Sequence, residues 1–352
     1  MKMKNVCFAA AAWGAKEPPM TGEAYGRRLF LIGAATAAAL ASGRAAPTNG
    51  RRKISMIEAP SNLGLRPVVR GRQPGAWRAP QALREAGLEA RLRPVATHAL
   101  ARPIYNFEGD GESRIRNGRA IRTFSEALAP LVAADLAAGN FPLVIGGDCS
   151  ILLGCLHGAG EVGLIHVDGH SDFYHPGNYD TQARLGSVAG MDLALATGRG
   201  EPLLADWGGR PLVADDRAVQ IGERDELTAD FDYRDIEDTA IHRIPVRRVL
   251  ANGIAATVQC ALSVGAAQSL PFWLHIDLDV LDEKVMPAVD SPGSPGLTYD
   301  QLADLVAGLL ASGRIRGASV TIYDPELDRT GRYAREIIGC LGRAFDALDT
   351  PA

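Results

Sequence analysis

The sequence predicts an α/β fold in which helices cover both faces of a mostly parallel β-sheet. Short apolar runs recur along the chain, each of the length of a buried strand (residues 141–145, 162–167, 218–221, 272–276 and 319–322). Segments with helical spacing lie between or after them (residues 150–159, 298–312 and 332–348). Strands that alternate with helices in this way are typical of a parallel sheet between two helical layers.

The composition is that of a globular protein and excludes several classes of function. Hydrophobic residues make up 47% of the 352 residues, charged residues 22%, and the net charge is -4. These values argue against disorder and against the basic surface that nucleic acid requires. The longest apolar runs are shorter than the roughly 18 residues of a membrane span. Five cysteines are too few for a disulfide scaffold, and we expect Cys155, Cys260 and Cys340 to be core residues.

Residues 1–46 resemble a bacterial export signal of the twin-arginine type. Arg27 and Arg28 precede an apolar stretch at residues 29–41, which ends in a small-x-small cleavage pattern. We therefore expect export to the periplasm, or a cytoplasmic location if this segment is instead an Ala-rich helix. The folded part is predicted to be a single domain over residues 51–352.

The first elements of that domain are a short strand at residues 53–58 and a helix at residues 80–91. Thr123 and Glu126 then have the spacing of a capping box, which predicts the start of a helix that ends at Gly139. Pro130 would lie near the start of that helix, where proline is tolerated.

Three of the predicted strands run directly into clusters of Asp, His or Cys. The clusters are Gly-Gly-Asp-Cys-Ser at residues 146–150, His-Val-Asp-Gly-His-Ser-Asp at 166–172, and His-Ile-Asp-Leu-Asp-Val-Leu-Asp at 275–282. Ligands of α/β sheets bind beyond the carboxyl ends of the strands, so the three clusters should meet in space. A lone Asp-x-Asp is usually a turn, but three such clusters at three strand ends predict a site.

The residue types in these clusters predict a centre for two divalent metal ions. Alternate residues of an extended segment point the same way, so Asp168, His170 and Asp172 can converge with Asp277 and Asp279. Carboxylate and imidazole ligands suit Mn²⁺, Fe²⁺, Co²⁺, Ni²⁺ or Zn²⁺. Two such ions about 3.5–4 Å apart would share carboxylates and hold a water for hydrolysis.

These motifs resemble those of the ureohydrolases, the family of arginase, agmatinase and formiminoglutamase. The resemblance extends from about residue 53 to the end of the chain and includes the stretches 75–84, 221–225 and 291–298. It implies a three-layer α/β/α sandwich, two manganese ions, and hydrolysis of a linear C–N bond in a small-molecule substrate. It also implies a homo-oligomer, either a trimer or a hexamer.

The resemblance also assigns roles to single residues. Asp168 and Asp277 match the bridging carboxylates, and Asp172 matches a ligand that also orients the attacking hydroxide. His170 and Asp279 match ligands of the second metal. Cys149 stands where the family has a first-metal histidine. Because a thiolate prefers softer ions, Zn²⁺, Fe²⁺, Co²⁺ or Ni²⁺ could replace Mn²⁺. Whether Cys149 is a ligand, a bystander or a reactive thiol stays open.

Two further positions depart from the family pattern. Ala189 stands where the family has a proton-shuttling histidine, and we expect His175 to donate the proton instead, with Tyr174 and Tyr179 as alternatives. Ile322 stands where guanidinium-binding members have a glutamate. That loss weakens the case for a guanidinium substrate, unless a carboxylate from elsewhere compensates (Glu223, Glu326 or Asp328).

The sequence therefore predicts a dinuclear metallohydrolase of a guanidine, amidine or amide C–N bond. The alternative is a member of the same fold that has lost catalysis and acts as a metal-dependent binding or structural oligomer. Cys149, Ala189 and Ile322 favour that alternative, whereas the intact carboxylate clusters favour the enzyme. A dinucleotide-dependent oxidoreductase is excluded because no Gly-x-Gly-x-x-Gly follows the first strand.

Overall fold

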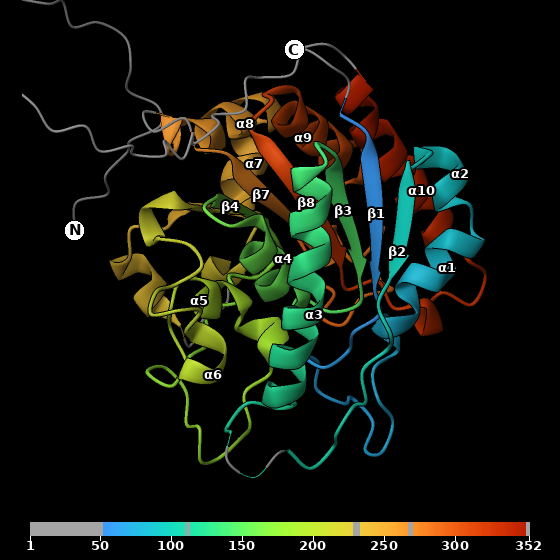
Figure 1. Ribbon diagram of the computed structural model, residues 1–352. Coiled ribbons are helices and arrows are strands. Elements are labelled where there is room, and N and C mark those ends of the chain that lie inside the picture. Colours follow the sequence, from blue (N-terminus) through green and yellow to red (C-terminus); the bar gives the residue numbers. More distant parts are fainter. Residues whose placement is uncertain (1–51, 110, 112, 228–232, 267–269, 350–352) are drawn as a thin grey trace, which may run out of the picture. The chain divides into compact units, whose positions relative to one another are not determined.

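The computed structural model describes residues 52–109, 111, 113–227, 233–266 and 270–349 (Figure 1). The predicted export signal, with Arg27, Arg28 and the 1–46 boundary, lies outside the described residues. Over the part that is described, none of the helices has the length and hydropathy needed to cross a membrane. The compact unit considered below spans Arg51–Ala352.

One sheet of eight strands forms the centre of this unit. The strands are β1 (Ile54–Ala59), β2 (Ala96–Ala99), β3 (Phe141–Gly146), β4 (Gly163–Val167), β5 (Ala218–Ile221), β6 (His242–Ile244), β7 (Phe272–Asp277) and β8 (Ile315–Thr321). They lie in the order β2-β1-β3-β8-β7-β4-β5-β6. Every neighbouring pair is parallel, which confirms the predicted sheet.

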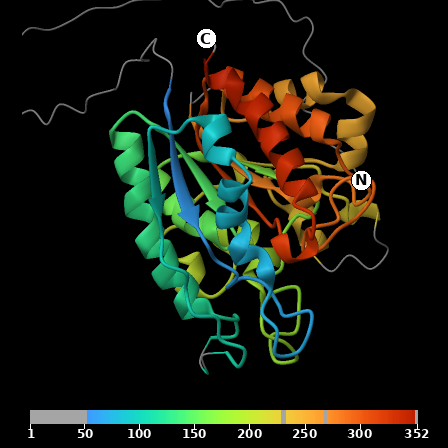
Figure 2. The same ribbon diagram turned by 90° about the vertical axis from the view of Figure 1, so that its right-hand side faces the viewer.

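Helices cover both faces of the sheet and make the predicted three-layer sandwich. One layer contains α3 (Gly118–Ala137), α4 (Ile151–Ala159), α5 (Asp192–Ala196) and α6 (Pro202–Ala205). The other contains α1 (Ala79–Glu85), α2 (Leu88–Leu92), α7 (Val246–Asn252), α8 (Ile254–Ser263), α9 (Tyr299–Ala311) and α10 (Arg332–Phe345). Figure 2 shows the sheet between these two layers.

All six strands expected from the sequence are present, and two more, β2 and β6, were not foreseen. Both lie at the edges of the sheet. Residues 97–99 of β2 are exposed, so the strand lacks an apolar run, and β6 has only three residues. Edge strands of this kind carry little hydrophobic pattern because neither face is fully covered.

The predicted helix boundaries need two corrections. Helix α3 begins at Gly118, so Thr123 lies inside the helix and makes no cap. Pro130 is consequently in the middle of α3, where its exposed position leaves the unpaired carbonyl of the preceding turn to water. The helix predicted at residues 80–91 is divided into α1 and α2 by Gly87, whose φ of 106° is left-handed.

Candidate metal centre

The loop after β3 holds Cys149 beneath the carboxyl end of the sheet. Gly147 packs so closely on Ser61 that a side chain there would overlap the Ser61 carbonyl oxygen. Cys149 is fully buried, and its thiol donates a hydrogen bond to Oδ2 of Asp277 over 2.8 Å. Burial, and then the charge of Asp277, raises the pKa of the Cys149 thiol. Without a cation nearby, Cys149 is therefore a protonated thiol.

The residues that follow β4 place their carboxylates near Cys149. Asp168 is fully buried, and its Oδ1 accepts a hydrogen bond of 2.6 Å from the backbone N–H of His170. Asp172 has a φ of 46°, an unusual backbone conformation for a residue other than glycine. Its carboxylate groups with Asp168 and with Cys149 in potential ligand sets.

The end of β7 completes the cluster. Oδ1 of Asp277 accepts a hydrogen bond of 2.7 Å from the backbone N–H of Asp279. Oδ2 of Asp279 lies 3.0 Å from Nδ1 of His170, and Oδ1 accepts from the N–H of Gly169 over 3.1 Å. The structure thus brings together the predicted ligands (Cys149, Asp168, His170, Asp172, Asp277 and Asp279).

The electrostatics of the cluster call for cations. Burial raises the pKa of Asp168, Asp172 and Asp277, and the neighbouring carboxylates raise it further. Burial also acts on Asp279, but His170 and then Arg224 outweigh it, so the pKa of Asp279 is lowered. Four carboxylates in one buried volume repel one another unless protons or metal ions neutralise them.

Arg224 supports the cluster from outside. Its guanidinium donates a hydrogen bond of 2.7 Å to the carbonyl oxygen of Asp279 and packs against Gly169 and Gly293. Any side chain at either glycine would overlap the guanidinium. No role for Arg224 was predicted from the sequence, because its contacts join three loops that are distant in the chain.

A second group of ligand-type residues lies one layer deeper. Its two histidines begin two of the predicted clusters but were given no role as ligands, and its aspartate was not foreseen. His166 and His275 precede Asp168 and Asp277 by two residues in β4 and β7, and Asp192 begins α5. The three residues are fully buried, and one ligand atom of each lies within 4.8 Å of the others. The period of two along each strand was a usable signal for the histidines.

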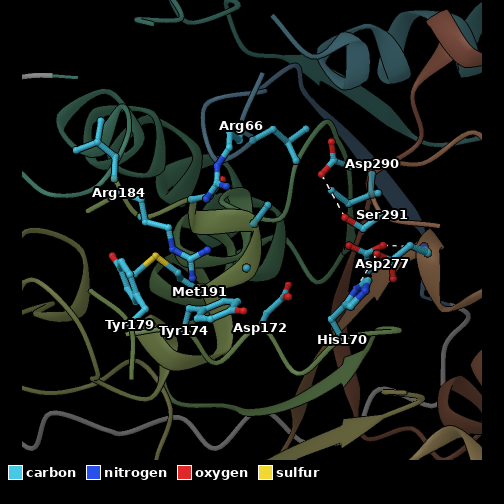
Figure 3. Close-up of a pocket in the computed structure, with 18 of the residues that line it drawn as sticks. Arg66, His170, Asp172, Tyr174, Tyr179, Arg184, Met191, Asp277, Asp290 and Ser291 are labelled. Atoms are coloured by element: carbon cyan, nitrogen blue, oxygen red, sulfur yellow. Dashed lines mark hydrogen bonds and ion pairs between the residues drawn. The ribbon is translucent and has the colours of Figure 1, made fainter. Parts of the chain in front are cut away.

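A cavity of about 400 Å³ opens above the carboxylates (Figure 3). His170, Asp172, Asp277 and Asp279 are among the residues that line it. The remaining lining residues are mostly aliphatic or small, and among them are three tyrosines, two arginines and one further carboxylate (Arg66, Tyr174, Tyr179, Arg184, Tyr233 and Asp290). Burial raises the pKa of Asp290 to about 6, with a further contribution from Asp279. A cavity of this size suits a small molecule.

His175, the predicted proton donor, does not line this cavity. Its Nε2 lies 2.6 Å from Oδ2 of Asp235, and its Nδ1 accepts a hydrogen bond from the N–H of Gly177. Both ring nitrogens are therefore occupied. The two alternatives, Tyr174 and Tyr179, do line the cavity.

Ile322 lies in the cavity wall, buried, with a φ of 74° that is strained for a β-branched residue. The carboxylates considered as replacements for the missing glutamate have other partners. Glu326 pairs with Arg72 and Arg78, and Glu223 pairs with Arg243. Asp328 accepts a hydrogen bond from the Tyr323 hydroxyl.

Comparison with known proteins identifies the family. The sequence model of the Arginase family matches residues 53–342. The chain belongs to the arginase family. This arginase-family chain is 31% identical over 316 residues to an arginase from Bacillus caldovelox, covering 84% of the chain and 98% of the relative. It is also 31% identical over 268 residues to a formimidoylglutamase from Aeromonas salmonicida, covering 74% of the chain and 77% of the relative.

The fold of this arginase-family chain is likewise similar to that of solved relatives. The structure of the Bacillus caldovelox arginase superposes with a TM-score of 0.72 at 28% identity, covering 84% of this chain and 98% of that one. The expected ureohydrolase resemblance and the α/β/α arginase fold are thereby confirmed.

The donor set of this family member fits divalent metal ions. Oδ2 of Asp168 is buried and has no hydrogen-bond partner among the described residues. A buried carboxylate oxygen without a partner is costly, and a bound cation would satisfy it. The combination of carboxylates and imidazoles matches the ligands that borderline divalent ions prefer.

Proposed function

We propose that this protein is a metal-dependent hydrolase that cleaves a non-peptide C–N bond in a small guanidine, amidine or amide. The observation that carries the proposal is the placement of His170, Asp172, Asp277 and Asp279 together in the lining of one cavity of about 400 Å³. The arginase and formimidoylglutamase relatives support the same class of reaction.

Two divalent ions held by the cluster would supply a water of lowered pKa and neutralise the carboxylates. Asp168, His170 and Asp279 are grouped to hold one ion, and Cys149 groups with Asp168 and His275 for the other. We propose Mn²⁺ for the position formed by Asp168, His170 and Asp279, whose ligands are mainly oxygens. Zn²⁺, Fe²⁺, Co²⁺ or Ni²⁺ would suit a position that includes a thiolate.

Asp172 is the residue that we propose to move the proton. It lines the cavity and is buried beside Asp168, so its carboxylate is placed to accept a hydrogen bond and a proton from a water held there. Asp172 would accept a hydrogen bond from the attacking water, take its proton and return it to the departing amine. His175 is replaced in this role because its ring faces Asp235.

The cavity walls narrow the proposed substrate class. Ile322 presents an apolar surface where a carboxylate would hold a guanidinium, whereas Arg66 and Arg184 line the same cavity. We therefore propose a substrate with an anionic group at the end away from the scissile carbon. A screen of guanidino, amidino and formimino compounds, each with and without a carboxylate, would test this through release of urea, ammonia or formamide.

The decisive variant is Asp277→Asn, because the amide keeps the shape of the side chain and removes its charge. We expect it to abolish turnover and to reduce metal uptake, measured as ions per chain. The matched control is Asp300→Asn, an exposed carboxylate paired with Arg343 on the surface, which should leave both unchanged. Full turnover by Asp277→Asn would contradict the proposal.

The second candidate is a metal-dependent binding or structural oligomer without catalysis. Ala189, Ile322 and the contact of His175 with Asp235 favour it, because each leaves the cavity without a group that the reaction would use. If the loaded protein holds its ions but hydrolyses none of the screened compounds, this second function should replace the first.

We also propose that the protein is a homo-oligomer, a trimer or hexamer, and that the twin-arginine segment exports it. Sedimentation velocity on the metal-loaded protein would give the oligomeric state. Replacing Arg27 and Arg28 together with lysine should retain the protein in the cytoplasm of a bacterial host. Unchanged export of that variant would contradict the assignment of the signal.

A further inference from the structure

The deep group of His166, Asp192 and His275 forms a compact array below the cavity. His166 and His275 are directly paired across β4 and β7, and their rings stack with centroids 5.1 Å apart and planes inclined by 18°. Neither histidine lines the cavity, whereas Asp277, two residues beyond His275, does. The structure therefore has two layers of ligand-type side chains at this edge of the sheet.

The carboxylate of Asp192 faces one nitrogen of each ring. Its Oδ1 lies 3.3 Å from Nε2 of His166, and its Oδ2 lies 3.6 Å from Nε2 of His275. Ligand atoms about 2.0–2.1 Å from a tetrahedral ion are separated by about 3.3 Å. The two distances are close to that separation, and the shorter one is also a hydrogen bond between His166 and Asp192.

The remaining contacts of the array leave the ligand atoms turned inward. Nδ1 of His275 lies 2.9 Å from Oγ of Ser319, which also accepts a hydrogen bond from the Trp273 indole. These contacts fix the His275 ring with its Nε2 toward Asp192. The same Nε2 also lies 3.5 Å from Oγ1 of Thr321. A ring that is fixed through one nitrogen and turns the other toward a carboxylate is suited to a metal ligand.

Two buried carboxylate oxygens in this array have no hydrogen-bond partner among the described residues. They are Oδ2 of Asp192 and Oδ2 of Asp168. The first has its nearest imidazole nitrogen at 3.6 Å, and the second lies 3.6 Å from Nε2 of His166. Both distances exceed that of a hydrogen bond, and a buried carboxylate oxygen without a partner is costly.

Asp168 connects the deep layer to the layer at the cavity base. Its Oδ2 faces His166 at 3.6 Å, and its Oδ1 lies 3.7 Å from Nδ1 of His170. One carboxylate thus presents one oxygen to each group. This is the arrangement by which a carboxylate bridges two ions.

We propose that His166 and Asp192 complete, with His275, the ligand set of the second of the two ions, and that Asp168 connects it to the ion held by His170 and Asp279. Two imidazoles and one carboxylate select Zn²⁺, Fe²⁺, Co²⁺ or Ni²⁺ over Mg²⁺ or Ca²⁺. Cys149 groups with His275 and with Asp192 and is the adjacent further ligand. The proposal concerns ion binding alone and does not depend on the C–N bond hydrolysis proposed above.

Stoichiometric titration of the metal-stripped full chain with Co²⁺ tests this proposal. The wild type should take up two ions per chain. Asp192→Asn and His275→Gln should each take up one, and so should Asp279→Asn, which removes the ion at the cavity base. His98→Gln replaces a partly exposed histidine far from the site and should still bind two. Two ions with unchanged affinity in His275→Gln would overturn the proposal.

Cys149→Ser separates the thiol from the three other ligands. This variant should keep two ions and lose only the thiolate-to-Co²⁺ charge-transfer absorption. Loss of a whole ion from Cys149→Ser, with His275→Gln still binding two, would assign the position to the thiol and overturn the proposal. Circular dichroism confirms that each variant is folded.

If Asp192→Asn and His275→Gln fail to fold, a measurement on the wild type alone still tests the proposal. Anomalous scattering from crystals of the Co²⁺-loaded wild type should give one peak among Nε2 of His166, Nε2 of His275 and the Asp192 carboxylate. It should give a second peak beside His170 and Asp279. A peak at the second position only, in crystals that bind Co²⁺, would overturn the proposal. Neither measurement uses turnover, so the hydrolase proposal can fail while this one holds.

Discussion

Arg224 controls the position of Asp279 without lying at the base of the cavity. Its guanidinium fits only because Gly169 and Gly293 leave it space, and it holds the backbone carbonyl of Asp279. A methyl group at residue 169 would lie about 2.5 Å from the guanidinium carbon. The side chain would therefore have to leave its place, and Asp279 would lose a fixed hydrogen bond.

We expect Gly169→Ala to lower the free energy of unfolding by about 1–3 kcal/mol, the usual cost of overpacking, and to weaken metal binding. Urea denaturation and a Co²⁺ titration would measure the two effects. Gly339→Ala is the matched control, since nothing lies within 4 Å of the added methyl on helix α10. It should instead stabilise the protein by up to about 1 kcal/mol. Equal effects of the two substitutions would contradict the role given to Arg224.

The burial of Cys149 has a chemical consequence. The thiol is fully buried, and burial together with the charge of Asp277 raises its pKa. The nucleophilic form of cysteine is the thiolate, so Cys149 should be unreactive in the folded protein. We expect iodoacetamide at pH 8 to leave Cys149 unmodified in both the metal-loaded and the metal-free protein, and to modify it in urea. Peptide mapping by mass spectrometry would show this, and rapid labelling of the native protein would restore the reactive-thiol interpretation.

At the level of single residues, the ligands that line the cavity could be predicted from the sequence because of their spacing and their place at strand ends. Asp168 and His170, and likewise Asp277 and Asp279, are two residues apart and lie where strands end. The same rule extended backward includes His166 and His275, which begin two of the predicted clusters but were given no role as ligands. Asp192 could not be found, because its place depends on how the loop between β4 and α5 folds.

At the level of elements, the central strands were predictable because burial on both faces makes them continuous apolar runs. Helix starts were less predictable, because the same capping pattern occurs in two settings. Thr298 and Gln301 form a true capping box at α9, with reciprocal hydrogen bonds of 3.2 and 2.9 Å. Thr123 and Glu126 have the equivalent pattern inside α3, where the backbone N–H groups are already paired.

These two threonines make a direct test of that difference. We expect Thr298→Ala to lower the free energy of unfolding by about 1 kcal/mol, the usual cost of a lost N-cap. Thr123→Ala removes an exposed β-branched residue from a helix interior and should raise the free energy of unfolding by roughly a few tenths of a kcal/mol. Thermal unfolding of the two variants beside the wild type would measure both. A destabilising Thr123→Ala would mean that residue 123 caps a helix after all.

At the level of the whole molecule, the stability of the protein should depend on pH in opposite ways with and without metal. Burial raises the pKa of Asp168, Asp172 and Asp277, so the folded metal-free protein holds protons that the unfolded chain releases above about pH 4. Stability that comes from such protons is present at low pH and is lost as the pH rises through the raised pKa values.

Metal binding should reverse this trend, because ions compete with protons for the same carboxylates. We expect the melting temperature of the chelator-treated protein to fall between pH 5.5 and pH 8, and the stabilisation by added Co²⁺ or Mn²⁺ to grow over the same range. One ion at a concentration 100 times its Kd contributes about 2.7 kcal/mol. A gap between the two melting temperatures that stays constant with pH would show that these carboxyls are ionised without metal.

The two-layer arrangement of the ligands also sets an order of events. His170, Asp277 and Asp279 face the cavity, whereas His166, Asp192 and His275 lie behind them. An ion that travels from the cavity to the deep group has to pass the outer group first. The inner ion would then be loaded first and released last, so a chelator should remove the outer ion quickly and the inner one slowly. Protein exposed briefly to a chelator would therefore keep the inner ion, because that ion can leave only slowly through the emptied outer position.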